Sequence, residues 1–352
     1  MSPDPAPRDP APTHSTGAPV LVADIGGTNA RFALAHADRP APEPLPSVPT
    51  GAHADFQSAA RAALSTTHPA ARAPDRPRHA IIAVAGPVTG AAIPLTNADW
   101  VIDPRAVLSD LDLETLIVLN DFEAQALALP VLGADDLLQI GSGQVLAHAP
   151  KVVLGPGTGL GVAAMVRANG RWLPIPGEGG HVEIGPVTAE EYRVWPHLDR
   201  LGGRIGAEQI LSGAGLVRLS QAIARAQGAA PRFEAPQEIP EAAARGEPVA
   251  AATLETFARV LGRVAGDHAL TFLARGGVYL AGGIPPRIEA HLTRSGFRDA
   301  FEAKAPHEAL MTGIPTFLVR HPAPALAGLA AYARDPQAFT LDLTGRLWTR
   351  TA

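Results

Sequence analysis

The sequence predicts an α/β protein built from two similar domains that face a cleft. Apolar segments of strand length alternate with helical segments along the 352 residues, an order typical of α/β folds. A pair of apolar strands joined by a glycine-rich turn occurs at residues 20–35 and again at residues 151–166. Two halves with the same opening hairpin indicate two domains, and the chain is long enough to give each its own core.

The first half is expected to form a strand-rich domain. Residues 20–24 (VLVAD) and 30–35 (ARFALA) read as a pair of strands. Residues 115–120 (TLIVLN) are apolar and β-branched, which favours a central strand, and they run directly into a helix at residues 122–129. The other elements expected here are a loop at residues 39–49, a helix at 55–64, and strands at 79–85, 92–95 and 100–102.

The second half repeats this plan and adds longer helices. Gly262 and Gly266 interrupt the apolar stripe of one helix, which predicts that a neighbouring element approaches it closely. His268 lies on the same stripe and is expected to be a core histidine with satisfied hydrogen bonds. Strands are expected at residues 151–154, 162–166 and 277–280, helices at 208–226 and 253–273, and a proline-rich break at 231–248.

Composition limits the classes of partner and site. The 29 basic and 34 acidic residues give a formal net charge of −5, so neither nucleic acid nor an acidic membrane is expected as a partner. The absence of cysteine excludes disulfides and thiolate zinc sites, and it suits a reducing cytoplasm. Residues 1–19 hold six prolines and lack a signal-peptide pattern, so a disordered leader and a cytoplasmic location are expected. No apolar stretch approaches the roughly 18–20 residues of a membrane span.

The first glycine-rich turn, DIGGTN, suits a nucleotide phosphate. Gly26 and Gly27 leave their amide N–H groups open to an anion. The side chains of Thr28 and Asn29 add further donors. Asp24 at the strand end can hold the Mg²⁺ that accompanies phosphates, directly or through water. A tight β-turn with a capping acid explains this stretch equally well on its own.

The second turn, GPGTGLG, favours the nucleotide interpretation. Gly157, Thr158 and Gly159 lie between apolar strands and can also cradle phosphate oxygens. The pattern is not a Walker motif, since no lysine follows, and not a Rossmann fingerprint, since a strand follows. Glycine turns on both halves therefore indicate a nucleotide held between the domains. Gly282 and Gly283, in AGGI, offer a third backbone surface for the adenosine end, or simply turn the chain from strand to helix.

Two polar stretches supply candidate catalytic groups. Asn120 and Asp121 follow the central strand, where an acid most often caps the next helix. Ligands also bind at the carboxyl ends of such strands, where Asp121 can take the proton of an attacking hydroxyl. The stretch GEGGHVE places Glu178, His181 and Glu183 among glycines, and these groups can converge on sugar hydroxyls. A metal site and a solvated loop are the alternatives, although no histidine cluster supports a metal.

In combination these motifs resemble the bacterial ATP-dependent glucokinase family, within the hexokinase and actin-like superfamily. The resemblance covers about residues 20–335 and rests on ADIGGTNARFAL, AGPVTG…LTNADW, LNDFEAQALALP, GPGTGLGVA, GEGGHVEIGP, AEQILSGAGLVRL and YLAGGIPPR, in the order of the family. It implies a two-domain actin-like, ribonuclease H-like fold with an interdomain cleft. It also implies that a homodimer transfers the γ-phosphoryl group of MgATP to glucose, giving glucose 6-phosphate for glycolysis.

The resemblance also implies roles for individual residues. Asp121 is similar to the catalytic base that deprotonates the 6-hydroxyl of the sugar. Residue 208 otherwise reads as helix surface, but it matches a sugar ligand of the family. The implied glucose ligands are Asn120, Asp121, Glu178, His181 and Glu208. The implied phosphate contacts are Gly26, Gly27, Thr28 and Thr158, with Asp24 near Mg²⁺, and Gly282 and Gly283 are implied as part of the adenosine site.

The family fold further implies how the chain divides. Residues 20–131 are expected to form the small domain, which a C-terminal helix at about residues 322–338 completes. Residues 132–321 are expected to form the large domain, and the tail at 339–352 has no assignment. The remaining alternatives are a kinase for another hexose, such as mannose, fructose or an N-acetylhexosamine, a non-catalytic sugar- or ATP-binding regulator, and an actin-like filament protein.

Overall fold

The computed structural model describes residues 17–64, 76–86, 88, 90, 92–95, 98–294 and 296–350. Most of the proline-rich leader, and parts of the PVTG and LTNADW stretches, lie outside these residues. The chain folds into two compact units. The first combines residues up to 131 with residues 167–174 and the stretch from 323 onward, and the second combines residues 132–166 with 175–322.

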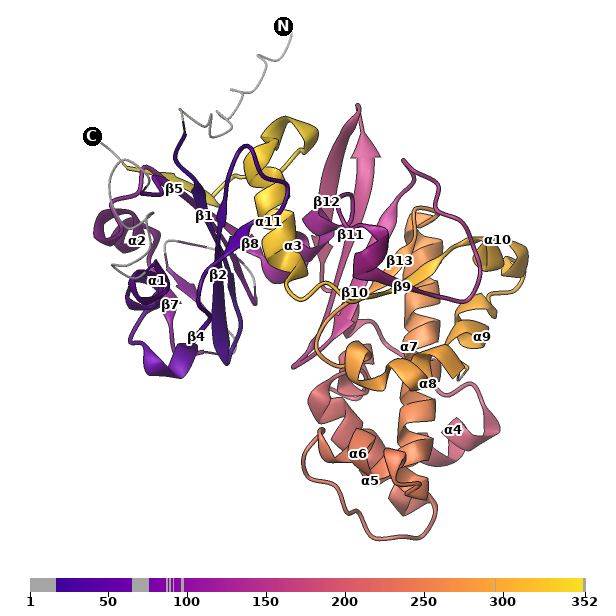
Figure 1. Cartoon of the computed structure of the whole chain (residues 1–352). Coiled ribbons are helices and arrows are strands. Elements are labelled where there is room, and N and C mark those ends of the chain that lie inside the picture. Colours follow the sequence, from indigo (N-terminus) through magenta and orange to yellow (C-terminus); the bar gives the residue numbers. More distant parts are fainter. Residues whose placement is uncertain are drawn as a thin grey trace, which may run out of the picture. The chain divides into compact units, whose positions relative to one another are not determined.

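The first unit contains a seven-stranded mixed sheet with the order β15-β8-β5-β1-β2-β3, in which β4 also pairs with β2 (Figure 1). β1, β5 and β8 run parallel to one another, whereas β2 and β15 are antiparallel to their neighbours. The three parallel strands are apolar and almost wholly buried, as is typical of strands covered on both faces. The strands are β1 (Val20–Ile25), β2 (Asn29–Ala35), β3 (Glu43–Pro44), β4 (Val48–Pro49), β5 (His79–Val84), β8 (Thr115–Asn120) and β15 (Leu347–Thr349).

Helices cover both faces of this sheet. α11 packs on α3 and contacts β1, β2 and β5, whereas α1 and α2 lie on the other face (Figure 1). Leu21, Ala23 and Ile25 pack on the α1–α2 side, so the alternation of a strand places Asp24 on the α3 side. α11 comes from the far end of the sequence and is part of the first unit. The helices are α1 (Phe56–Leu64), α2 (Pro104–Asp110), α3 (Asp121–Ala128) and α11 (Pro324–Arg334), and β6 (Ile93–Pro94) pairs with β7 (Val101–Ile102).

The second sheet has the order β12-β11-β10-β13-β14-β9 and repeats the plan of the first. As predicted, two antiparallel strands joined by a glycine-rich turn occur in both sheets, β1–β2 and β10–β11. β13 is parallel to β10 and β14 is parallel to β13. Residues 167–174, the tip of the β11–β12 hairpin, belong to the first unit, where Trp172 O accepts a hydrogen bond from Thr340 N at 2.7 Å. The strands are β9 (Leu137–Ile140), β10 (Lys151–Pro156), β11 (Leu160–Ala168), β12 (Arg171–Gly177), β13 (Val278–Leu280) and β14 (Thr316–Val319).

The long helix α7 is the centre of the helical part of the second unit. It packs against α5, α6 and α9 (Figure 1). The predicted close approach at its glycines is confirmed, because a Cβ at Gly262 would clash with Phe297 O and one at Gly266 would lie 2.8 Å from Phe301 O. The helices are α4 (Ala189–Val194), α5 (Gly213–Ala226), α6 (Glu238–Ala244), α7 (Pro248–Phe272), α8 (Glu289–Arg294), α9 (Phe297–Glu302) and α10 (Glu308–Gly313).

Three local expectations are wrong. Residues 39–49 are not only a loop, since β3 and β4 pair with β2 there. The proline-rich break at residues 231–248 contains α6, whose Pro240 lies in the first turn, where a missing N–H breaks no helical hydrogen bond. Residues 208–226 are not one helix, because Ser212 caps α5 by accepting a hydrogen bond from Gly215 N at 3.0 Å. The tail, unassigned from the sequence, supplies β15.

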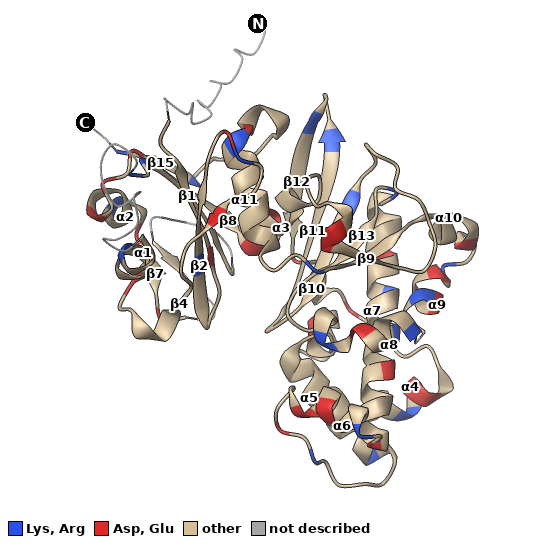
Figure 2. Ribbon diagram, viewed as in Figure 1, with Lys and Arg blue, Asp and Glu red and all other residues tan. Residues whose placement is uncertain are grey.

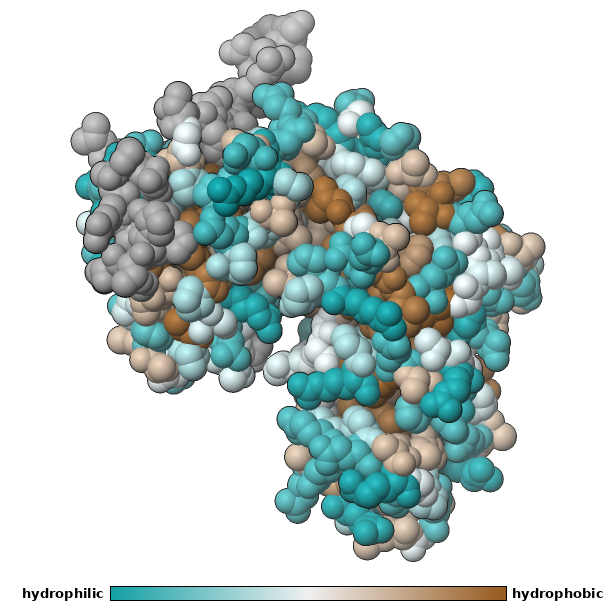
Figure 3. All heavy atoms as spheres, in the orientation of Figure 1, coloured by the Kyte–Doolittle hydropathy of each residue, from teal (hydrophilic) through white to brown (hydrophobic). Residues whose placement is uncertain are grey.

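Both signs of charge are spread over the helices of the second unit. α4, α8 and α9 each carry acidic and basic residues (Figure 2). The visible face of each unit is largely hydrophilic, with hydrophobic residues at scattered places (Figure 3). Within the described residues, no helix combines the length and apolarity needed to cross a bilayer.

Replacing Gly262 with alanine tests the contact between α7 and α9. The new Cβ would meet the carbonyl oxygen of Phe297, a main-chain atom that cannot move without shifting α9. Alanine favours a helix over glycine by about 1 kcal/mol, but overpacking costs about 1–3 kcal/mol, so we expect Gly262→Ala to lower the free energy of unfolding by up to about 2 kcal/mol in urea titrations. Gly313→Ala, where the Cβ meets no atom within 4 Å, is the control. Equal effects of the two substitutions would contradict this packing.

Candidate active site

The carboxyl ends of three parallel strands form one edge of the first sheet. Ile25 of β1 is paired in register with Val84 of β5, and Val84 with Asn120 of β8. Polar groups at the ends of these strands therefore gather along one line. Asn120 Nδ2 donates to Gly86 O at 3.3 Å, which ties the end of β8 to the end of β5.

Asn120, not Asp121, caps helix α3. The Oδ1 atom of Asn120 accepts hydrogen bonds from Phe122 N at 2.9 Å and Glu123 N at 3.2 Å. Asp121 occupies the first helical position, and its Oδ1 accepts from Phe122 N at 2.9 Å. The capping role that explains most acids at such a position thus falls to the preceding residue. Another role is therefore open to the Asp121 carboxylate.

The Asp121 carboxyl is a stronger base than an ordinary aspartate. Burial, and then the nearby charge of Asp24, raise its pKa to about 6, although the amide of Phe122 opposes the shift. Burial also raises the pKa of Asp24, against the effect of Arg31, whose Nη1 lies 3.4 Å from Asp24 Oδ2. Two carboxyl groups with raised pKa values near the carboxyl ends of parallel strands are typical of functional sites.

The first glycine turn is exposed, and Thr50 donates hydrogen bonds to its main chain. Gly27, Thr28 and Asn29 are exposed, and Gly26 N donates to Asn29 O at 3.0 Å. The buried side chain of Thr50 donates to Gly27 O at 2.7 Å, and Thr50 N donates to Thr28 O at 3.0 Å. Thr50 cannot be found from the sequence, because no local pattern reveals a partner that lies 22 residues after Thr28.

The second glycine turn is attached at several points. Gly157 N donates to Gly159 O at 2.8 Å, and Gly157 O accepts from Gly213 N, the first residue of α5, at 2.8 Å. Leu160 N donates to Glu208 Oε2 at 2.8 Å. Thr158 at the tip is exposed. The turn therefore presents its tip to solvent while its two ends are fixed.

The AGGI stretch packs on the strand that leads into this turn. Gly282 has a φ of +82°, and a Cβ there would lie 2.6 Å from Pro156 O, so two separate reasons require glycine. Ile284 N donates to Pro156 O at 3.2 Å. A Cβ on Gly157 would lie 4.0 Å from Gly283 N. The two stretches predicted to bind phosphate and adenosine are thus neighbours in the second unit.

The GEGGHVE stretch joins the segment that carries Glu208. Ala207 N donates to Val182 O at 2.9 Å, and Ile184 N donates to Ile205 O at 2.9 Å. A Cβ at Gly180 would clash with Leu160 O, so the stretch also lies against the second glycine turn.

The predicted sugar ligands of the second unit differ in exposure. The side chains of Glu178 and His181 are 80% and 58% exposed, with 3.6 Å between Glu178 Oε2 and His181 Nε2. Glu208 is half-buried on a 3₁₀ turn (Ala207–Gln209) rather than on helix surface. Within the described residues, no group of three or more histidines and acids could hold a metal ion.

His268 differs from the expectation. It is buried, but its Nε2 has no hydrogen-bond partner among the described residues. Burial lowers its pKa, which favours the neutral ring. A Cβ at Gly179 would lie 2.7 Å from His268 Cε1. The ring therefore supports the GEGGHVE stretch by packing, not as a fully satisfied polar group.

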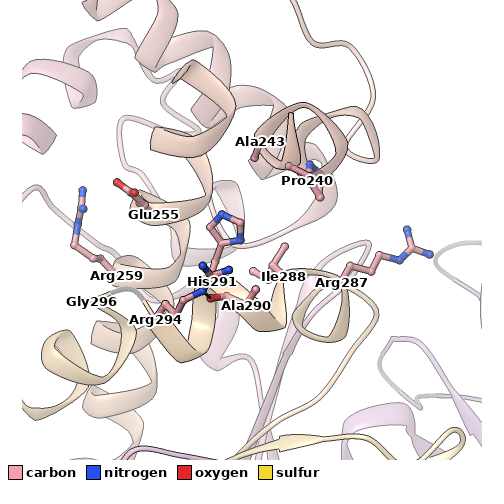
Figure 4. Close-up of a pocket in the computed structure, with 11 residues that line it drawn as sticks. Pro240, Ala243, Glu255, Arg259, Arg287, Ile288, Ala290, His291, Arg294 and Gly296 are labelled. Carbon is pink, nitrogen blue, oxygen red and sulfur yellow. Dashed lines mark hydrogen bonds between the residues drawn. The ribbon is translucent and has the colours of Figure 1, made fainter. Parts of the chain in front are cut away.

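A pocket of about 640 Å³ lies within the second unit, between α6, α7 and the segment around α8 (Figure 4). His291 lies between Glu255 of α7 and the α6 residues, and Arg287 extends away on the other side of Ile288 (Figure 4). Arg287 stands four residues after Gly283 in the AGGIPPR motif. The lining combines apolar and charged side chains, among them Pro240, Ala243, Glu255, Arg259, Arg287 and His291.

Comparison with known proteins decides among the interpretations. The profile of the glucokinase family matches residues 21–336. A glucokinase of Sinorhizobium fredii is 51% identical over 339 residues, which cover 96% of this chain and 98% of that relative. The chain belongs to the bacterial glucokinase family.

Solved structures of glucokinases confirm the predicted two-domain actin-like α/β fold. The glucokinase from an Antarctic psychrotroph has a TM-score of 0.80 at 34% identity, over 90% of this chain and 98% of that one. A ROK family glucokinase from Streptomyces griseus, solved in complex with glucose and AMPPNP, shares the fold, with a TM-score of 0.60 at 22% identity over 90% of this chain and 98% of that one. As a member of the glucokinase family, the chain is an ATP-dependent hexose kinase with glucokinase activity.

The raised pKa of Asp121 predicts a pH-dependent stability. Because the folded pKa of about 6 lies above the ordinary value of 3.8, the native state holds the proton more tightly than the unfolded chain. The wild type is expected to lose stability as the pH rises from about 4 to about 6. Asp121→Asn keeps an oxygen for Phe122 N and removes this cost. We expect it to raise the free energy of unfolding by roughly 1–3 kcal/mol at pH 7.5, at 1.36 kcal/mol per pKa unit.

Urea titrations at pH 5 and pH 7.5 measure this difference. Glu114→Gln is the control, since Glu114 precedes the same strand β8 and its exposed carboxylate pairs with Arg78 at 2.8 Å. The account is wrong if Asp121→Asn is no more stable than the wild type at pH 7.5, or if its advantage does not shrink at pH 5.

Proposed function

We propose that this chain transfers the γ-phosphoryl group of ATP to the 6-hydroxyl of glucose with Asp121 as the general base. The observation that carries the proposal is the position of Asp121, at the carboxyl end of a buried parallel strand with its pKa raised to about 6. A base with that pKa is mostly ionised at neutral pH and holds a proton better than an ordinary aspartate. Membership of the glucokinase family indicates the reaction, and the Asp121 carboxylate can accept the proton that the reaction releases.

The proton and the phosphoryl group move in opposite directions. The 6-oxygen of glucose attacks the γ-phosphorus, the bond from that phosphorus to the bridging oxygen of ADP breaks, and the hydroxyl proton passes to Asp121. The products are glucose 6-phosphate and ADP, and solvent then removes the proton from Asp121. Because such transition states are loose and anionic, positioning and charge neutralisation supply most of the acceleration.

The sugar is proposed to bind through Asn120, Glu178, His181 and Glu208. Asn120 uses its Oδ1 and one Nδ2 hydrogen within the protein, which leaves a second Nδ2 hydrogen to donate to a sugar hydroxyl. The carboxylates of Glu178 and Glu208 can each accept from a hydroxyl. His181 can donate or accept, according to its tautomer.

The nucleotide is proposed to bind along the two glycine turns. The amides of Gly26, Gly27, Gly157 and Gly159 approach the phosphate oxygens, as main-chain N–H groups do in anion sites. The side chains of Thr28, Asn29 and Thr158 are exposed and add donors. Gly282 and Gly283 are proposed to contact the adenosine end.

Mg²⁺ is proposed to bind beside Asp24, directly or through water. The residues fit this ion, because Mg²⁺ in nucleotide sites takes one or two carboxylates together with phosphates and waters. Asp24 and Asp121 supply carboxylates close enough for one to raise the pKa of the other. Arg31, the ion-pair partner of Asp24, has a side chain that is 52% exposed, so it can turn to solvent when a cation arrives. The ion supplies neutralisation of phosphate charge.

The cellular setting is proposed from the same chemistry. A homodimer in the cytoplasm, acting at the start of glycolysis, is the arrangement that the family resemblance implies. The absence of cysteine suits a reducing compartment.

A stronger preference for another hexose is the alternative that a panel of sugars tests. Carboxylates that accept from hydroxyls do not by themselves distinguish glucose from its epimers. A coupled assay of ADP release with glucose, mannose, fructose and N-acetylglucosamine, with and without Mg²⁺, separates the two. The proposal requires the highest kcat/KM with glucose and loss of turnover when Mg²⁺ is removed.

Asp121→Asn tests the proposed base. We expect kcat with glucose to fall by on the order of 10²–10⁴, the range for loss of a general base, while the glucose affinity changes far less. The coupled assay gives kcat and titration calorimetry gives the affinity. Glu114→Gln, at the opposite end of β8, is the matched control and is expected to keep wild-type turnover. Near-normal turnover of Asp121→Asn rejects the assignment.

A further inference from the structure

A proposed sugar ligand also holds the turn that is proposed to receive the nucleotide phosphates. Glu208 Oε2 accepts a hydrogen bond from Leu160 N at 2.8 Å. Leu160 follows Gly159 directly and is the first residue of β11. A carboxylate that accepts from a main-chain amide at this distance makes a charge-assisted bond, which is stronger than one between neutral groups.

The residue beside this bond is a glycine that leaves room for the carboxylate. A Cβ on Gly159 would lie 2.5 Å from Glu208 Oε2 and 3.2 Å from its Cδ. Any side chain at this position would therefore push the carboxylate away from Leu160 N. The glycine of the turn thus has a second purpose besides exposing its amide to an anion, namely to admit Glu208.

The main chain on both sides of Glu208 is fixed by burial and by hydrogen bonds. Ala207, Ile210 and Leu211 are fully buried around it. Ala207 N donates to Val182 O at 2.9 Å, and Gly206 N donates to Gln209 Oε1 at 2.8 Å. Because the main chain on both sides is fixed, the carboxylate can hold the turn rather than merely follow it.

The two oxygens of Glu208 allow it to serve both substrates. A carboxylate offers about four lone-pair sites, so the bond from Leu160 N to Oε2 leaves Oε1 for a sugar hydroxyl. Glu178 has no comparable position, since its side chain is 80% exposed and lies 3.6 Å from His181. Of these two proposed sugar ligands, Glu208 therefore contacts the turn of residues 155–161, whereas Glu178 pairs with His181 in its own loop.

We propose that Glu208 is a positioning residue for the phosphoryl donor, because its carboxylate holds the turn of residues 155–161 in the conformation that receives the nucleotide phosphates. This inference rests on the proposed function, in which that turn binds ATP. A residue that only binds sugar has no effect on the nucleotide when sugar is absent. A positioning residue weakens nucleotide binding even then.

The test measures MgADP affinity by titration calorimetry without sugar. Glu208→Ala is expected to weaken MgADP binding about tenfold or more, the loss that follows from removing one charge-assisted hydrogen bond. Glu208→Gln keeps an oxygen that can accept from Leu160 N but loses the charge, so we expect its affinity to lie between those of the wild type and Glu208→Ala. Glu178→Ala is the matched control and is expected to bind MgADP like the wild type without sugar.

Amide hydrogen exchange of the sugar-free and nucleotide-free protein gives a second readout. In Glu208→Ala, exchange at Leu160 is expected to quicken, and in Glu208→Gln to return toward the wild-type rate, while thermal melts check that both variants fold. Exchange in Glu208→Ala equal to the wild type overturns the inference, as does MgADP affinity that is unchanged in Glu208→Ala or equally reduced in Glu178→Ala. Failure of the proposed function has a different result, in which Asp121→Asn keeps its turnover while the exchange at Leu160 still depends on Glu208.

Discussion

The in-register ends of the parallel strands β1, β5 and β8 are the constraint on which the first unit depends. Main-chain pairing aligns Ile25, Val84 and Asn120, so Asp24 and Asp121 lie at the same end of the sheet. The charge of Asp24 contributes to the raised pKa of Asp121, although 96 residues separate the two in the sequence. Burial on both faces of the sheet then raises the pKa of both carboxyls. The raised pKa of Asp121 is thus a consequence of burial first and of the nearby Asp24 second, not of a local motif.

In the second unit, glycines allow the loops of the candidate site to pack closely. Three loops approach one another so closely that a Cβ at Gly159, Gly180 or Gly282 would meet Glu208, Leu160 or Pro156. Missing side chains allow main-chain atoms and one carboxylate to fill the space. Glycines that are proposed to expose amides to a phosphate therefore also let the GEGGHVE stretch, the second glycine turn and the AGGI stretch pack closely together. Changes in one loop are expected to affect the next.

Much of this arrangement can be predicted from the sequence, but not all of it. Alternating apolar runs located β1, β2, β5, β8, β10 and β11, and the spacing of Gly262 and Gly266 revealed the approach of α9. The short elements β3, β4 and α6 were not predicted. Their segments are rich in proline, which indicates a loop when strand pairing and helix packing are unknown. The contacts of Thr50 and the hydrogen bond from Leu160 to Glu208 were not predicted either. Contacts between residues 22 to 48 positions apart produce no periodic pattern in the sequence. The resemblance to the glucokinases, not the local pattern, singled out Glu208 as a ligand.

The most direct test of the central claim is a crystal structure of this chain with glucose and a non-hydrolysable ATP analogue. The account predicts that a carboxylate oxygen of Asp121 accepts a hydrogen bond from the 6-hydroxyl of glucose, at about 2.6–3.2 Å, with that hydroxyl oxygen facing the γ-phosphorus. A 6-hydroxyl bonded to a different carboxylate, or an Asp121 side chain that contacts only protein in the complex, would contradict it.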